Sequence, residues 1–369
     1  MWSSRLSDRS LRIRCFHSQR STQSNRQRRR KRSMPVTEKT LDRKLAQIRA
    51  GQYVPSDFII ADAKDGDMGF GAGAPGPVYD QDNQPTDRMC TLADYRAGMR
   101  DMVRSGLVDI MLTSVSSAEA LRANGTYADT PVTPAVRLND TTDIWSLRGG
   151  AYRTLQARPF RTARLKHART VADLGLYSVT FYNDIDRDVA TLEAYAVFRE
   201  EAEAVGMRHF LEVFNPAFAI DTGGVDLGFY VNDAIARALA GVALAERPLF
   251  LKMSYNGPSA MEELASFDPQ NLVVGILGGA AGTTRDTMEL VAQAERHGAR
   301  VALFGRKIWY AESPTEIVRL MRRVIEREAS PSEAVRLYHD VLAKAGIRAR
   351  RPLDQDNEVT DPILKAGAC

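Results

Sequence analysis

Two charged side chains stand inside short runs of otherwise apolar residues. Lys252 lies within residues 249–253, and Glu212 lies within residues 210–214. Runs of this kind are typical of parallel strands that are buried on both faces. An ammonium on such a strand must pair with a carboxylate or give up its proton. A deprotonated lysine attacks carbonyl groups and forms a Schiff base, so Lys252 is either an imine-forming nucleophile or half of a structural ion pair.

Glu212 occupies a matching position in the run that directly precedes the Lys252 run. Neighbouring strands lie ~4.8 Å apart, so the two side chains meet if both point to the same side. A buried lysine–glutamate pair has two interpretations. One is a structural ion pair, and the other is a Schiff-base lysine with its proton-transfer partner.

Eight apolar, β-rich runs recur along the chain, and helical patterns separate most of them. The runs cover residues 57–62, 108–113, 134–139, 177–182, 209–214, 249–253, 272–277 and 301–304. The helical patterns cover residues 37–50, 92–105, 161–174, 191–205, 231–245, 259–266, 284–297 and 315–326. This alternation predicts an α/β fold, a (β/α)8 TIM barrel over residues 34–330. A doubly wound open sheet is the alternative, but no GxGxxG follows the first strand.

Catalytic groups of such barrels lie at the carboxyl ends of the strands. Besides Glu212 and Lys252, these ends carry Asp62, Arg137 and Tyr255. We take Asp62 and Tyr255 as catalytic candidates and Arg137 as a substrate-binding candidate. The Gly/Pro-rich loop 66–77 follows the first strand and is either a lid or a cluster of structural turns.

The last two strands of the predicted barrel each end in glycine, at Gly278-Gly279 and at Gly305. Loops after the seventh and eighth strands often bind phosphate through backbone N–H groups. Glycines allow a close backbone approach, and Arg306 has the charge to pair with a phosphoryl oxygen. Tight turns alone are the other explanation for these glycines.

A metal site is not visible in the sequence, because the five histidines lack the HxH or HxxxH spacing of metal ligands. We therefore expect neither a metal nor another cofactor. Three scattered cysteines suggest no disulfide framework and fit a reducing cytoplasm. Those cysteines are Cys15, Cys90 and Cys369.

The composition is that of a globular protein, with 44% hydrophobic and 26% charged residues among 369. No apolar run approaches the ~20 residues that span a bilayer. Residues 1–33 differ, because they carry ten arginines, one lysine and one acid. We favour a disordered basic extension, which an upstream start codon would explain. A transit peptide and a nucleic-acid-binding arm are the alternatives.

The net charge of +4 depends on that extension, and without it the chain carries about −6. A mildly acidic body argues against nucleic-acid binding. The segment from residue 331 to 369 predicts one more helix and a polar tail. We expect a small-molecule partner, no membrane partner, and a homo-oligomer.

We expect residues 1–33 to be dispensable, because their composition cannot bury a core. A chain that begins at Met34 is expected to keep the melting temperature and the kcat of the full chain. A large fall in either quantity would show that the extension docks on the barrel.

Three segments in the last third of the chain resemble the class I, metal-independent aldolases of the DhnA and tagatose-bisphosphate aldolase type. They are residues 251–257, 277–279 and 304–309. The resemblance spans roughly residues 39–325. Residues 134–139 are similar to the third strand of the DhnA group. Residues 181–186 and 210–214 are more similar to the tagatose-bisphosphate group.

The resemblance implies roles for individual residues. It implies that Lys252 forms the Schiff base, that Glu212 carries a proton and that Asp62 lies in the active site. It also implies that the glycine loops at Gly278-Gly279 and Gly305-Arg306 hold a substrate phosphate.

The sequence departs from both groups at three places. Phe214 stands where the DhnA group has its catalytic tyrosine, and Ser178 stands where the tagatose group has a lysine. The loop at residues 63–68 matches neither group. The substrate therefore need not be fructose- or tagatose-bisphosphate, nor carry two phosphates.

The sequence thus predicts a metal-independent Schiff-base aldolase of carbohydrate metabolism, a lyase that cleaves or forms a C–C bond in a ketose. We expect the ketose to be phosphorylated. Lys252 attacks the carbonyl, and Glu212, Tyr255 or Asp62 moves the proton of the C4 hydroxyl. The alternatives are an acyl transferase or thiolase on the same barrel, and a barrel that binds a sugar phosphate without turnover.

Overall fold

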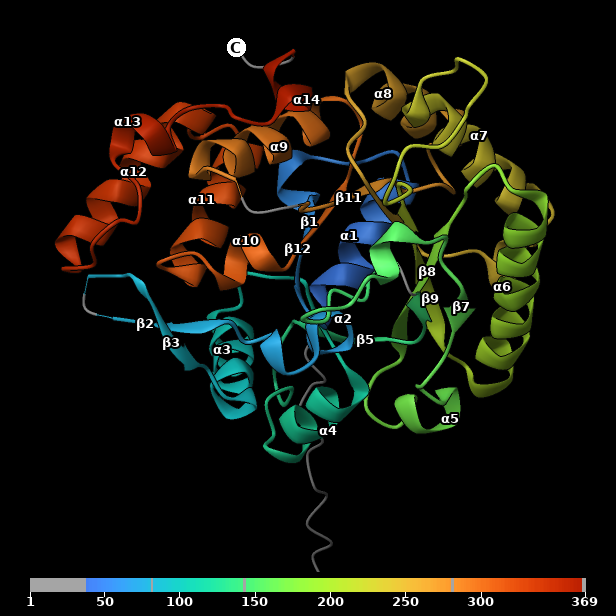
Figure 1. Cartoon of the computed structure of the whole chain (residues 1–369), viewed down its shortest axis with the longest axis horizontal. Coiled ribbons are helices and arrows are strands. Elements are labelled where there is room, and N and C mark those ends of the chain that lie inside the picture. Colours follow the sequence, from blue (N-terminus) through green and yellow to red (C-terminus); the bar gives the residue numbers. More distant parts are fainter. Residues whose placement is uncertain (1–37, 81, 142–143, 280–281, 367–369) are drawn as a thin grey trace, which may run out of the picture. The chain divides into compact units, whose positions relative to one another are not determined.

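The computed structural model describes residues 38–80, 82–141, 144–279 and 282–366. Eight parallel strands close into a barrel in the order β1-β12-β11-β10-β9-β8-β5-β4 (Figure 1). The predicted TIM barrel is confirmed, and β1 pairs with both β12 and β4, so the sheet has no open edge. The strands are β1 Ile59–Lys64, β4 Ile110–Thr113, β5 Thr133–Arg137, β8 Leu174–Thr180, β9 Arg208–Phe214, β10 Leu251–Met253, β11 Gly275–Leu277 and β12 Val301–Phe304.

Helices follow the strands around the barrel. They are α1 Thr40–Arg49, α2 Asp67–Phe70, α3 Leu92–Ser105, α4 Val115–Ala123, α5 Leu165–Ala168, α6 Ile185–Val205, α7 Leu227–Ala240, α8 Pro258–Phe267, α9 Thr284–Arg296, α10 Arg306–Trp309, α11 Pro314–Ile325, α12 Pro331–Lys344, α13 Leu353–Asp356 and α14 Pro362–Lys365. Two small antiparallel ribbons complete the fold, one of β2 Pro77–Tyr79 with β3 Pro85–Met89 and one of β6 Asp140–Thr141 with β7 Pro159–Phe160.

Several helices differ from the sequence prediction. The short helices α2, α10, α13 and α14 were not predicted, and the last two lie in the expected polar tail. Helix α4 was not predicted, because serines and alanines leave it without a broad apolar stripe; Ala118 and Leu121 are its buried apolar residues. The predicted helix at residues 161–174 is reduced to the single turn α5, and β8 already begins at Leu174.

Apolar side chains fill the barrel below the site. Side chains of a strand alternate between its two faces, so every second residue points inward. Phe210 of β9 and Phe250, directly before β10, stack inside the barrel with ring centroids 4.6 Å apart. Two residues further along each strand stand Glu212 and Lys252, which are register partners. The alternation therefore aims both charged side chains into the interior, above the apolar layer.

Helix α1 contributes Leu41, Leu45 and Ile48 to the apolar cluster that contains the inward residues of the strands. After α12, the chain returns to the barrel wall, where Thr360 donates its backbone N–H and its hydroxyl to Asp286 of α9. Within the described residues, no helix has the length and apolarity needed to cross a membrane. The predictions for residues 1–33 lie outside the described residues.

Candidate active site

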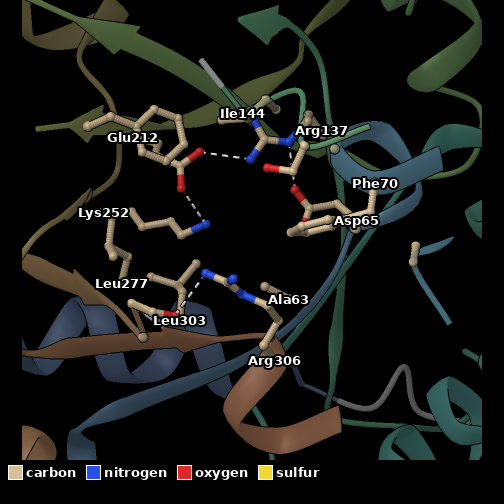
Figure 2. Close-up of a pocket in the computed structure, with 18 of the residues that line it drawn as sticks. Ala63, Asp65, Phe70, Arg137, Ile144, Glu212, Lys252, Leu277, Leu303 and Arg306 are labelled. Carbon is tan, nitrogen blue, oxygen red and sulfur yellow. Dashed lines mark hydrogen bonds and ion pairs between the residues drawn. The ribbon is translucent and has the colours of Figure 1, made fainter. Parts of the chain in front are cut away.

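A cavity of about 490 Å³ lies at the carboxyl ends of the barrel strands, within the usual size range of small-molecule sites. Seven of the nine residues predicted for the site line it: Lys252, Glu212, Arg137, Gly278, Gly279, Gly305 and Arg306 (Figure 2). The predicted loop after β1 lines it as well, through Gly66, Gly69, Phe70 and Ala74. The other two predicted residues, Asp62 and Tyr255, are not among the lining residues.

Four charged groups form a continuous chain of contacts across the cavity (Figure 2). Lys252 Nζ lies 2.5 Å from Glu212 Oε1. Arg137 donates from Nη2 to Glu212 Oε2 at 2.8 Å and from Nε to Asp65 Oδ2 at 2.6 Å. All four side chains are buried, and two positive charges balance two negative ones. Lysine and glutamate therefore meet as the two apolar runs predict, and Lys252 is paired in the resting site.

Ser178 and Arg137 hold Glu212 in place. The Ser178 hydroxyl donates to Glu212 Oε2 at 2.7 Å and accepts from Arg137 Nη1 at 2.7 Å. The side chain of Asn139 holds the backbone of Ser178. Asn139 Oδ1 accepts the Ser178 N–H at 2.6 Å, and Asn139 Nδ2 donates to the Ser178 carbonyl at 2.8 Å. Both Glu212 oxygens are thus oriented before any ligand enters. Arg137, predicted to bind substrate, lines the cavity and also positions Glu212, because it donates to Asp65, Ser178 and Glu212.

The charge balance sets the ionisation of the two carboxyl groups. Burial on its own would raise the pKa of Glu212, but the charges of Lys252 and Arg137 outweigh it and lower that pKa. Burial would likewise raise the pKa of Asp65, and Arg137 and Lys252 again reverse the shift. Both groups are therefore carboxylates at neutral pH, the state in which they accept protons.

Asp65 takes the place that the sequence prediction gave to Asp62. Strand β1 runs to Lys64, two residues beyond the predicted end of the first strand. Ile59 and Ala61 belong to the interior apolar cluster, so odd-numbered positions face inward and Asp62 faces outward. Asp65, three residues later, is the carboxylate that reaches the cavity. The alternation of apolar residues within the strand could have identified Asp65, because it determines which positions point inward once one of them is known.

Asp62 forms a buried ion pair with Lys64 away from the cavity. The other carboxylate oxygen, Oδ2, has no hydrogen-bond partner among the described residues. Lys64 Nζ also lies 5.6 Å from the ring centroid of Trp309. Because Lys64 is fully buried and does not line the cavity, it has no access to a carbonyl substrate.

We expect Lys64→Met to destabilise the fold strongly. It leaves the carboxylate of Asp62 buried without its counter-ion, a change that typically costs about 3–5 kcal/mol. Urea unfolding measures this cost. Asp62→Asn/Lys64→Met, which removes both charges, is the matched control and is expected to recover much of the loss. Equal stability of Lys64→Met and the wild type would show that the pair contributes nothing.

Tyr255 lines a second cavity of about 330 Å³ and not the cavity at Lys252. Its hydroxyl donates to Gln293 Oε1 at 3.2 Å. Burial raises the pKa of Tyr255 above its usual range. The side chain is thus engaged away from Lys252, and it is poorly placed to move a proton of a ligand bound there.

The glycines at the ends of β11 and β12 meet two different requirements. Gly279 has a φ of +63°, a conformation that other residues rarely adopt. A Cβ at Gly305 would lie 2.5 Å from the carbonyl oxygen of Ala63, so only glycine fits beside β1. Arg306 donates from Nη2 to the Gly279 carbonyl at 3.1 Å. Tight turns are therefore part of the explanation, and the same glycines line the cavity.

Among the described residues, no group of three or more His, Cys, Asp or Glu side chains could hold a metal ion. If the reaction depends on Lys252 and Glu212, as the sequence predicts, turnover is expected to be unchanged by EDTA. The assay is the rate of substrate cleavage before and after chelation, with added zinc as the second arm. Complete loss that zinc restores would require a metal-dependent mechanism instead.

No protein-family model matches the sequence, and a search of curated proteins finds no match either. Solved structures do resemble this one. An archaeal fructose 1,6-bisphosphate aldolase is 16% identical, with a TM-score of 0.55 over 78% of this chain and 99% of that chain. A Schiff base-forming fructose-1,6-bisphosphate aldolase is 16% identical, with a TM-score of 0.54 over 77% and 99%.

A fructose-bisphosphate aldolase from Slackia heliotrinireducens is 14% identical, with a TM-score of 0.55 over 84% of this chain and 93% of that chain. Identities this low show a shared fold, and a fold hosts many reactions. The chemistry of this chain has to be argued from its own site.

Proposed function

We propose that this protein is a Schiff base-forming aldolase that acts on a ketose. The observation that carries the proposal is the contact of 2.5 Å between Lys252 Nζ and Glu212 Oε1 at the wall of a closed-barrel cavity. A lysine at a cavity wall, in direct contact with a carboxylate that can take its proton, has the two groups that imine chemistry needs. The resemblance to Schiff base-forming aldolases supports the same reaction.

The proposed reaction proceeds in four steps. Glu212 accepts a proton from Lys252, and the amine adds to the ketose carbonyl to give a carbinolamine. Glu212 returns the proton to the carbinolamine hydroxyl, which leaves as water, so the protonated imine forms and Glu212 is again a carboxylate. The bond between C3 and C4 then breaks, its electron pair moves toward the imine to form an enamine, and a carboxylate takes the C4 hydroxyl proton. The aldehyde leaves, the enamine is protonated on carbon, and water hydrolyses the imine to release the second product.

Glu212 is the carboxylate that we assign to the C4 proton, because it touches Lys252 and is ionised. Asp65 is the other carboxylate at the cavity wall. Phe214, which also lines the cavity, has no proton to transfer. A phenylalanine at this position, which cannot take part in proton transfer, favours a second candidate function, a barrel that binds a sugar phosphate without turnover.

The test is a panel of ketose phosphates, each incubated with the protein and followed by NMR for the appearance of an aldehyde. We expect one member of the panel to be cleaved, and borohydride added with that ketose to inactivate the protein. A binder without turnover would protect the protein against heat yet give neither the aldehyde nor the inactivation. No binding and no cleavage across the panel would reject both functions.

A further inference from the structure

The rim of the cavity carries two guanidinium groups that the charge chain at Lys252 does not use. Arg306 follows β12, and Arg153 belongs to a short helical turn, Tyr152–Thr154, in the connection between β5 and β8. Both line the cavity, and both are exposed. Among the described residues, neither is paired with a carboxylate. The cavity therefore has a surplus of two positive charges over its balanced interior.

Arg153 is held in place although it comes from a long connection. The ring of Tyr152, its neighbour in sequence, packs edge-on against Trp145 with centroids 5.1 Å apart. Trp145 packs in the same manner against Phe160 of β7, at 5.0 Å. Ser146 donates its N–H to the Gly69 carbonyl at 2.9 Å, which ties this connection to the loop after β1. The turn that carries Arg153 is thus fixed beside the cavity before a ligand binds.

The two guanidinium groups line the same cavity of about 490 Å³. Although the Arg306 guanidinium reaches solvent, partial burial of the side chain lowers its pKa; Tyr310 opposes this shift, and the positive charge of Arg153 adds to it. Two like charges held near one another without a counter-ion are unfavourable until an anion lies between them. A phosphoryl group carries a charge of about −1.5 to −2 at neutral pH and has three acceptor oxygens, so it matches two guanidinium groups. A carboxylate, with one charge, would neutralise only one of them.

We propose that Arg153 and Arg306 together form a clamp for one phosphoryl group of the substrate, with Arg153 as the residue that selects phosphorylated over unphosphorylated ligands. This inference rests on the proposed function for the identity of the molecule that carries the phosphoryl group. The clamp itself requires only that a phosphate dianion binds between the two arginines. Arg153, the second group of the clamp, comes from the β5–β8 connection, outside the glycine loops at β11 and β12.

Titration with inorganic phosphate, followed by phosphorus-31 NMR, tests the clamp without any assumption about the reaction. Arg153→Gln and Arg306→Gln are each expected to raise the half-saturating phosphate concentration by about tenfold or more, equivalent to about 1.4 kcal/mol per tenfold change. Arg148→Gln is the matched control, because Arg148 is exposed on the same connection but does not line the cavity. This control is expected to titrate like the wild type.

Three outcomes would overturn the clamp: no phosphate binding by the wild type, an Arg153→Gln titration equal to the wild type, or an equal loss in Arg148→Gln. A second experiment connects the clamp to the reaction. Arg153→Gln is expected to raise the concentration of a ketose phosphate needed for half-maximal borohydride trapping, with no effect on the unphosphorylated ketose. If the wild type binds phosphate as expected but forms no imine with any ketose, the aldolase proposal fails and the clamp stands.

Discussion

Replacing Lys252 with alanine is expected to abolish imine trapping and to lower turnover by several orders of magnitude. The amine is the nucleophile, and no other described group at the cavity wall can replace it, because the remaining cations there are arginines. The fold is expected to survive. Glu212 keeps its hydrogen bonds to Arg137 and Ser178 after Lys252 is removed, so its buried carboxylate is not left alone.

Two measurements separate a lost nucleophile from a damaged fold. The melting temperature of Lys252→Ala is expected to stay close to that of the wild type, and phosphate binding at the rim is expected to persist. Lys166→Ala is the control, because Lys166 is exposed on α5. Trapping that persists in Lys252→Ala would show that a different lysine forms the adduct.

Glu212→Gln is expected to slow C–C cleavage by about 10²–10⁴-fold, the usual contribution of general acid–base catalysis. Glutamine retains the shape and can still accept hydrogen bonds from Arg137 and Ser178. It cannot take up the C4 proton, and its amide does not neutralise the ammonium of Lys252. We therefore expect imine formation to survive in this variant, because Lys252 remains at the cavity wall.

Single-turnover kinetics with borohydride quenching measure the two steps of this variant separately. Glu201→Gln serves as the control, because Glu201 pairs with Arg161 and neither residue lines the cavity. If Glu212→Gln instead loses trapping and recovers it only at higher pH, imine formation requires Glu212 as the acceptor of the Lys252 proton, and solvent does not replace it. The C4 proton would then pass to another group, and Asp65 is the remaining carboxylate in the cavity.

The sequence predicted the barrel and its central pair for physical reasons that the structure makes plain. Strands buried on both faces are continuously apolar, so a single charge within one is conspicuous. The matched positions of Glu212 and Lys252 in consecutive strands became adjacent register partners. All eight strand positions followed from the same apolar signal, although β1 ends two residues later than predicted.

The remaining parts of the site depend on features that single residues do not reveal. Asp65 was missed because a shift of one residue exchanges the two faces of a strand, and Asp62 within the first strand and Asp65 directly after it occupy positions of opposite kind. Arg153 was missed because it approaches the cavity through a long connection whose path is set by the packing of Trp145. The pairing of Arg137 with both carboxylates depends on contacts between β1, β5 and β9, which are far apart in sequence.

Peptide mapping by mass spectrometry after borohydride reduction, with the ketose phosphate that the protein cleaves, tests the central claim most directly. The chain offers three instructive lysines: Lys252 at the cavity wall, Lys64 buried beyond it, and Lys307 at the second cavity. We predict a single adduct, on Lys252, with the mass of the reduced imine. An adduct on Lys64 or Lys307, or cleavage of the ketose with no adduct on any lysine, would contradict the account.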